Sequence, residues 1–170
     1  MFIDMHVHPA FYDPVNADTE AGIRKEELRH DALDIHLNGT APLEHIFNQM
    51  ACAGLDYLCL LPQDYRSEYG EPIVSNEEIR RLVDLAPDKF IGFAGVDPFD
   101  KDAADTLEYA FLELKLKGLK LHPSRQRFYP SDESAGQLSA IYDLCEKYDK
   151  PIIFHSGLSW EPHALSKYSR

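Results

Sequence analysis

Met1-Phe-Ile-Asp-Met-His-Val-His8 opens the chain as a short strand that ends in two histidines. Side chains alternate along a strand, so His6 and His8 share one face, while Ile3 and Val7 share the other. Two neighbouring imidazoles can chelate a divalent metal ion. A single histidine at a strand end would be read as an ordinary polar residue, but two at this spacing favour metal binding.

The composition is that of an acidic, globular domain. The 170 residues suffice for one domain with a sizeable core, and 44% of them are hydrophobic. Acidic residues outnumber basic ones by 29 to 17, and no basic run stands out, so we expect no nucleic-acid partner. Cys52, Cys59 and Cys145 form no CxxC pair and are predicted to be buried free thiols. With neither a signal peptide nor a membrane-spanning stretch of about 20 residues, the sequence predicts a cytoplasmic protein without a membrane partner.

A long polar segment follows the first strand. Residues 9–40 have no strand pattern and only a weak helical pattern over 23–33. A loop of this length inside a compact domain is usually functional. We therefore predict that it forms a lid or wall of the candidate site, with a plain surface insertion as the alternative.

Strands and helices alternate through the rest of the chain. Strand starts recur roughly every 30 residues, a rhythm typical of βαβ units and a parallel sheet. Two architectures fit, an open doubly wound sheet or a (β/α)8 barrel. No glycine-rich phosphate loop follows any strand, which removes the usual nucleotide-binding reason for an open sheet. The predicted strands are 55–61, 90–96, 119–122 and 152–155. Four helices are predicted between and before them. The first covers 42–54, the second is capped by Ser75 and Glu78, the third covers 103–114 and is closed by Gly118, and the fourth has Asp132 and Glu133 in its first turn.

Polar residues gather at the carboxyl ends of these strands. Parallel strands bring those ends to one face, where barrel enzymes build their sites. Histidines from several strands on one face are hard to explain by packing alone. The residues concerned are His6, His8, Asp97, Lys120, His122 and His155.

Three segments resemble the amidohydrolase superfamily. They are Ile3-Asp-Met-His-Val-His8, Gly118-Leu-Lys-Leu-His-Pro123 and Pro151-Ile-Ile-Phe-His-Ser-Gly157. The resemblance is strongest to the amidohydrolase-2 branch, which includes aminocarboxymuconate semialdehyde decarboxylase and related decarboxylases and hydrolases. It implies a (β/α)8 TIM-type barrel, of which residues 1–170 would cover about the first five βα units.

The resemblance also implies a metal site. His6 and His8 match the first-strand ligands, and His155 matches the fifth-strand ligand. The implied cofactor is a divalent metal, zinc first, with manganese or another ion as alternatives. The implied function is a metal-dependent hydrolase or decarboxylase that acts on a small carboxylated molecule through a metal-bound water.

Other site residues carry two interpretations each. Lys120 occupies the strand where some family members carry a carbamylated, metal-bridging lysine. We favour the other interpretation, in which Lys120 pairs with a substrate carboxylate. His122 is a catalytic candidate, as an acid/base or orienting group, or a histidine that merely hydrogen-bonds near the barrel mouth. Arg125 and Trp160, in loops after strands and expected to be exposed, are weaker candidates for substrate binding.

The family's sixth-strand histidine and eighth-strand aspartate cannot be assigned in residues 1–170. The sequence is expected to be a fragment or a natural half-barrel, whose unpaired edges favour a homo-oligomer, for example a dimer. One alternative function is a TatD- or PHP-type metal phosphoesterase, although TatD-like chains carry a fourth-strand glutamate where this one has Lys120 and His122. The other is a truncated, catalytically incomplete metal-binding half-barrel.

Overall fold

A curved parallel sheet runs through the molecule. The computed structural model describes residues 1–16, 20–36 and 39–169. One sheet has the order β1-β2-β3 and the other β4-β5-β6, and every pair is parallel. Phe93 alone separates β3 from β4, and its N–H donates to the Leu60 carbonyl at 3.0 Å, so β3 and β4 act as one bent strand. The strands are β1 (Ile3–Val7), β2 (Tyr57–Leu60), β3 (Phe90–Gly92), β4 (Ala94–Gly95), β5 (Leu119–Leu121) and β6 (Ile152–Phe154).

The spatial order of the strands therefore follows their order in the chain. Helices α2, α4, α5 and α7 connect successive strands, and right-handed crossovers in this order place helices on one side of the sheet. A doubly wound sheet would reverse its order, so this is the wall of a partial (β/α)8 barrel, as the sequence predicted. The helices and 3-10 turns are η1 (Asp13–Val15), α1 (Glu20–Leu33), α2 (Leu43–Ala53), α3 (Arg66–Tyr69), α4 (Asn76–Leu85), α5 (Ala103–Leu112), α6 (Pro123–Gln126), α7 (Leu138–Lys147) and η2 (Ser166–Ser169).

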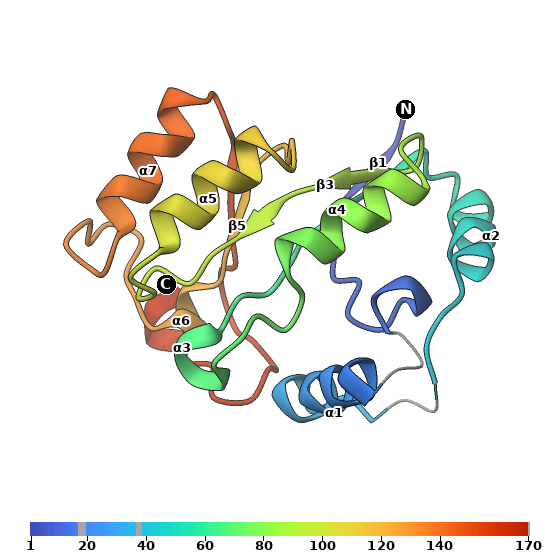
Figure 1. Ribbon diagram of the computed structural model, residues 1–170, viewed down its shortest axis with the longest axis horizontal. Helices are drawn as coiled ribbons and strands as arrows, with labels where there is room; N and C mark the ends of the chain where they lie inside the picture. The colour runs from blue at the N-terminus through green and yellow to red at the C-terminus, as the bar shows by residue number, and fades with distance from the viewer. Residues whose placement is uncertain (17–19, 37–38, 170) are drawn as a thin grey trace.

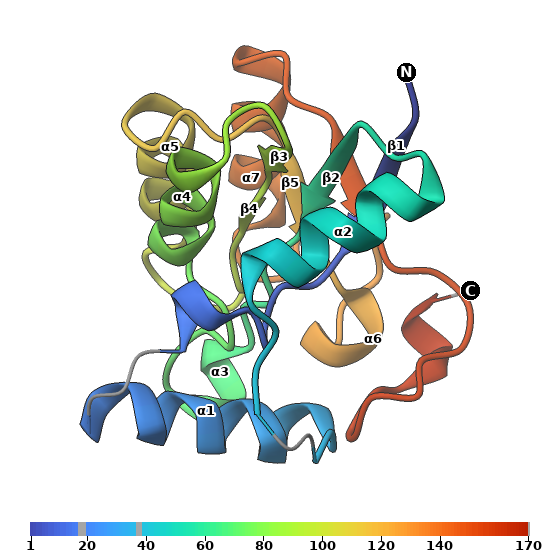
Figure 2. The ribbon, with the colours of Figure 1, turned by 90° about the vertical axis from the view of Figure 1, so that its right-hand side faces the viewer.

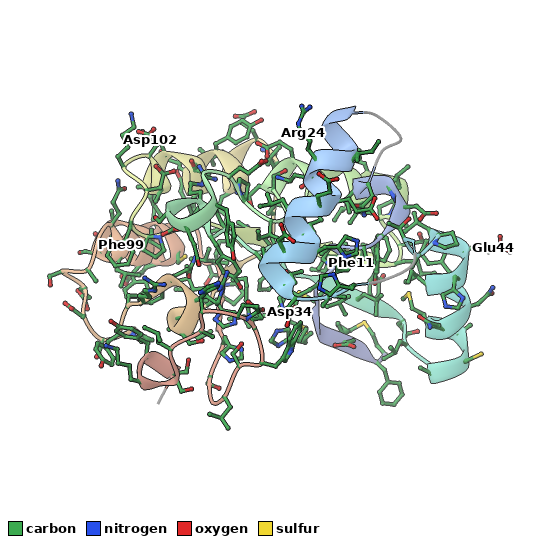
Figure 3. The ribbon with its side chains drawn as sticks, turned by 90° about the horizontal axis from the view of Figure 1, so that it is seen from below. Phe11, Arg24, Asp34, Glu44, Phe99 and Asp102 are labelled. Carbon is green, nitrogen blue, oxygen red and sulfur yellow. The ribbon has the colours of Figure 1, made fainter. Side chains whose placement is uncertain are left out.

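Helices α1, α3 and α6 lie at the carboxyl end of the strands (Figure 1). In Figure 1, α4, α5 and α7 lie along one side of the sheet, while α1, α3 and α6 lie below it. The view turned by 90° places α1, α3 and α6 at the same lower end, beyond the tips of the strand arrows (Figure 2). Seen from below, α1 crosses the molecule with Phe11 beside it (Figure 3). This end of the sheet is where the sequence placed the polar residues.

Both faces of β2 are buried, which is typical of a barrel strand. Leu58 and Leu60 belong to the main hydrophobic cluster. Cys59, together with the following Leu61 and Phe93, forms a smaller cluster of its own. The alternation along one strand separates these two sets.

Residues 9–40, predicted as a long loop with only a weak helical pattern over 23–33, contain a full helix in their middle, where α1 spans 14 residues. Arg29 explains why the helical pattern was weak. It is fully buried, and its guanidinium donates to the carbonyls of Val15 and Ile73 and to the Glu78 carboxylate at 2.6 Å. A charged residue at a buried position breaks the hydrophobic period on which the prediction depended. Residues 17–19 and 37–38 of this segment lie outside the described residues.

The predicted start of the α4 helix is confirmed by its cap. Ser75 Oγ accepts from the Glu78 N–H at 3.2 Å, and Glu78 Oε2 accepts from the Ser75 N–H at 2.8 Å. The start predicted for α7 is wrong, because that helix begins at Leu138 and Asp132 and Glu133 lie in the preceding turns.

Two further predictions from the sequence are wrong. Cys52 is exposed, whereas Cys59 and Cys145 are buried as expected. Gly118 does not close α5, which already ends at Leu112. It leads into β5, where a Cβ atom would lie 2.5 Å from the Phe93 ring, so glycine is required there for close packing.

Candidate functional site

His6 and His8 point two ring nitrogens at each other. Their Nε2 atoms are 3.0 Å apart. Nδ1 of His8 lies 3.0 Å from the Leu61 carbonyl, which can only accept, so Nδ1 carries the proton and Nε2 of the neutral ring keeps its lone pair. Burial, followed by the charge of Lys120, lowers the pKa of His8 to about 4. The ring is therefore neutral at physiological pH, the form that binds a metal.

Lys120 approaches the same pair from β5. Its Nζ lies 3.3 Å from Nε2 of His6, and the side chain is buried. Burial lowers the pKa of Lys120 to about 8, against the opposing charge of Glu161. Burial and the lysine charge also lower the pKa of His6. The three side chains thus form one contact group at the carboxyl end of the sheet.

His122 and His155 form a second pair. Their rings stack with centroids 4.0 Å apart and planes 10° from parallel. Nε2 of His155 is buried and has no hydrogen-bond partner among the described residues. Burial, then the charges of His155 and Lys120, lower the pKa of His122 to about 2, so this ring too is neutral.

All four histidines line one cavity of about 290 Å³. Phe11 and Leu33 also line it, so part of the 9–40 segment forms a wall of this cavity. Trp160 and Glu161 contribute from the segment after β6. The sequence prediction of the site residues rested on strand ends, and the cavity brings four of those residues together.

Glu161 is a site residue that the sequence analysis missed. It is 9% exposed, and its two carboxylate oxygens accept from Gln63 Nε2 and from the Tyr65 hydroxyl, each at 2.9 Å. Burial raises its pKa, while Tyr65, Arg125 and Gln63 oppose the rise. Its position six residues after His155, in a segment without periodicity, gave no signal in the sequence.

Arg125 and Trp160, the two candidates for substrate binding in loops, line different cavities. Trp160 is 69% exposed at the edge of the histidine cavity. Arg125 is buried in α6, so the expectation that it is exposed is wrong. Its guanidinium lies 4.5 Å over the Tyr65 ring and 3.3 Å from Glu68 Oε2. It lines a neighbouring cavity, also of about 290 Å³, and does not line the histidine cavity.

The histidine nitrogens fit part of a metal site. Ligands about 2.0–2.1 Å from zinc are roughly 3 Å or slightly more apart, which agrees with the His6–His8 separation. The Leu61 carbonyl orients His8 as outer partners orient metal-binding histidines. Among the described residues, however, no three His, Cys, Asp or Glu side chains are already arranged to hold one ion. The His6–His8 pair therefore fits a metal ion. His155 lines the same cavity, and its Nε2 has no hydrogen-bond partner among the described residues, so it is the candidate for a third ligand.

The sequence matches the Amidohydrolase family over residues 3–169. The chain belongs to the amidohydrolase family. No curated protein matches it. In the described part of the chain, no helix combines the length and apolar character needed to cross a bilayer.

Several solved structures share the fold of this chain. An uncharacterised TIM-barrel protein from Bordetella bronchiseptica has a TM-score of 0.66 and 19% identity, over 98% of this chain and 58% of that one. A 4-oxalomesaconate hydratase from Rhodopseudomonas palustris has a TM-score of 0.56 and 21% identity, over 91% and 52%. A 5-carboxyvanillate decarboxylase mutant from Novosphingobium aromaticivorans, with bound manganese and a nitrobenzoic acid, has a TM-score of 0.55 and 19% identity, over 86% and 41%. This amidohydrolase chain thus spans between about two fifths and three fifths of their lengths.

Proposed function

We propose that this amidohydrolase chain carries metal ligands of a metal-dependent hydrolase or decarboxylase that acts on a small carboxylated molecule. The observation that carries the proposal is the pair of His6 and His8 Nε2 atoms 3.0 Å apart, in a cavity shared with the unpartnered Nε2 of His155. Two of the similar solved structures are named for carboxylated compounds, a 4-oxalomesaconate hydratase and a 5-carboxyvanillate decarboxylase, and the second holds bound manganese. Zinc suits three imidazoles best, with manganese as the alternative.

The ligands, the lysine and the apolar walls have different roles in this function. His6, His8 and His155 hold the ion, which when bound supplies Lewis-acid chemistry. Lys120, buried beside His6, pairs with the carboxylate of the substrate. The walls at Phe11 and Leu33 exclude water from one side of the cavity.

The family match favours this function over a phosphoesterase. Lys120 and His122 occupy the strand end where a TatD-like site carries a glutamate, and both are buried there. A metal-binding domain without activity is the second candidate, because no third ligand is in place around the His6–His8 pair among the described residues.

The test is the metal content of the purified chain after incubation with zinc or manganese and removal of excess ion. We expect about one ion per chain, lost in His6→Ala and in His155→Ala. His45→Ala, an exposed histidine on α2, is the matched control and should keep the ion. Retention of the ion in both site variants would refute the assignment.

Activity is tested separately on the metal-loaded chain. Carboxylated aromatic acids and amides are incubated with it, and release of carbon dioxide or amine is followed by NMR. Turnover of a carboxylated compound that disappears in His155→Ala supports the enzyme. Metal binding with no turnover of either class favours the metal-binding domain, and turnover of a phosphodiester alone would favour the phosphoesterase.

A further inference from the structure

Glu161 lies between the histidine cavity and the buried guanidinium of Arg125. Its Oε1 faces Nε2 of His122 at 3.7 Å, and its Oε2 faces Nε of Arg125 at 3.6 Å. Both separations exceed hydrogen-bond length, whereas the bonds from Gln63 and Tyr65 are 2.9 Å. Two neutral donors therefore fix the carboxylate so that one oxygen is aimed at the edge of the His122 ring.

The charge state of this carboxyl follows from its partners. Gln63 and the Tyr65 hydroxyl both donate, and the guanidinium of Arg125 lies nearby. Burial raises the pKa of Tyr65 well above its ordinary value, so the phenol keeps its proton and remains a donor. Burial raises the pKa of Glu161, while a donor on each oxygen and the nearby guanidinium oppose that rise and stabilise the ionised form.

The opposite edge of the His122 ring meets a hydroxyl. Ser124 is fully buried, and its Oγ lies 3.1 Å from Nδ1 of His122. A serine hydroxyl can donate or accept, so it adapts to either tautomer. A carboxylate oxygen can only accept, so it favours a proton on Nε2. The two neighbours together select the ring with Nε2 protonated and Nδ1 accepting from Ser124.

His122 is also held by its backbone. Its N–H donates to Gln126 Oε1 at 2.8 Å, and Gln126 in turn donates to the carbonyls of Asp64 and Val96. These contacts hold the backbone of His122, whose ring is stacked on that of His155 with centroids 4.0 Å apart. The orientation of His122 therefore sets the plane in which the His155 ring lies.

We propose that Glu161 is a positioning residue that holds His122 in the tautomer protonated at Nε2, and thereby orients the stacked ring of His155. This inference rests on the proposed function, in which His155 is a ligand. It assigns His122 an orienting role, because both of its nitrogens face protein groups. Glu161 and His122 support His155 from the side of its stacked face. Carboxylate–histidine pairs in other proteins fix the tautomer and the orientation of a ring in this way.

The test reads the tautomer directly. Long-range ¹H–¹⁵N NMR correlations of the imidazoles are recorded on the metal-free ¹⁵N-labelled chain, with His122 assigned from the signals lost in His122→Asn. We expect the wild type to show Nε2 protonated. In Glu161→Gln, the signals should move towards the Nδ1-protonated form, and Glu161→Asp, which keeps the carboxylate, should restore at least part of the wild-type pattern.

Glu68→Gln is the matched control. Glu68 also contacts Arg125, but its carboxylate does not face His122, so the tautomer should not change. An Nδ1-protonated wild type would overturn the proposal, and so would a folded Glu161→Gln with unchanged His122 signals. If Glu161→Gln does not fold, the wild-type pattern decides, together with Tyr65→Phe, which removes one donor that aims the carboxylate and should yield mixed tautomers.

The two proposals fail in different ways. A chain that shows the expected tautomer but binds neither zinc nor manganese refutes the proposed function and leaves the role of Glu161 towards His122 intact. A chain that binds metal with the opposite tautomer refutes only the positioning role.

Discussion

Nε2 of His6 and Nε2 of His8 are 3.0 Å apart, a distance at which one of the two nitrogens must carry a proton and the other must accept it. The His8 proton is held on Nδ1 by the Leu61 carbonyl, so the bond needs a proton on His6 Nε2. Lys120 Nζ, 3.3 Å from that same atom, would donate to it instead. A cation bound by both nitrogens relieves this competition. The contact therefore links metal binding to the state of Lys120.

Replacing Lys120 by methionine tests that link. The ammonium repels a divalent ion at the neighbouring nitrogen. Two unit charges 4 Å apart interact by about 1 kcal/mol in water, and the double charge of the ion raises this to about 2 kcal/mol. We expect Lys120→Met to bind zinc about 30-fold more tightly in calorimetry, and to lose affinity for carboxylate ligands. Lys117→Met, at an exposed position, should do neither. Loss of the ion from Lys120→Met would instead support the carbamylated, metal-bridging lysine.

The partly buried His8 makes stability depend on pH. The pKa of His8 in the folded chain is about 4, below its ordinary value of 6.5, so the unfolded chain binds more protons between these values. The contribution of His8 to the free energy of unfolding is fully present above about pH 6.5 and is lost as the pH falls from 6.5 towards 4. At pH 5 the loss from this one group is about 2 kcal/mol.

Urea unfolding of the metal-free chain at pH 7.5, 6 and 5 measures this loss. His8→Gln should be less stable at pH 7.5, because it loses the contact with the Leu61 carbonyl, but lose less on acidification, because the imidazole that is neutral in the folded chain is gone. His45→Ala, at an exposed site, should follow the wild type. Equal losses in His8→Gln and the wild type would contradict the depressed pKa of His8.

The strands and their carboxyl ends could be predicted from the sequence, because most of the strands are short apolar runs and the polar residues at their ends stand out. That logic placed His6, His8, Lys120 and His122 at one end of the sheet, where they lie. Glu161 could not be predicted, since its partners come from distant segments and meet only in the folded chain. The helix around Arg29 gave only a weak pattern in the sequence, because the partners that allow Arg29 to be buried also come from distant segments.

Arg29 should be required for docking α1. Its guanidinium joins α1 to the 73–78 segment and to η1 through the contacts given above. Arg29→Met leaves the Glu78 carboxylate and two carbonyls without their donor, which costs about 3–5 kcal/mol when a buried ion pair is broken. Chemical denaturation measures the change, with exposed Arg81→Met as control. A loss below 1 kcal/mol would show that other contacts dock the helix.

Self-association is expected at β1. Among the described strands, β1 and β6 each pair on one side only, and Phe2 and Met5 are 71% and 46% exposed. Edges and apolar faces of this kind favour a second copy of the chain. Light scattering should give a dimer mass that falls to the monomer in Phe2→Asp/Met5→Lys. A monomer at all concentrations would refute the predicted homo-oligomer.

Gly118 should tolerate no side chain. A Cβ there would lie 2.5 Å from the Phe93 ring and 2.7 Å from the Pro151 carbonyl oxygen, and the backbone atom cannot turn away. We expect Gly118→Ala to lower the free energy of unfolding by about 1–3 kcal/mol, as overpacked cores do. Phe93→Leu in the same chain should recover only part of this loss, because the Pro151 contact persists. Gly54→Ala is the comparison, since its Cβ meets open space and only its φ of +68° costs energy, about 1 kcal/mol. A Gly118→Ala protein as stable as the wild type would mean that β5 and the strand carrying Phe93 can separate without cost.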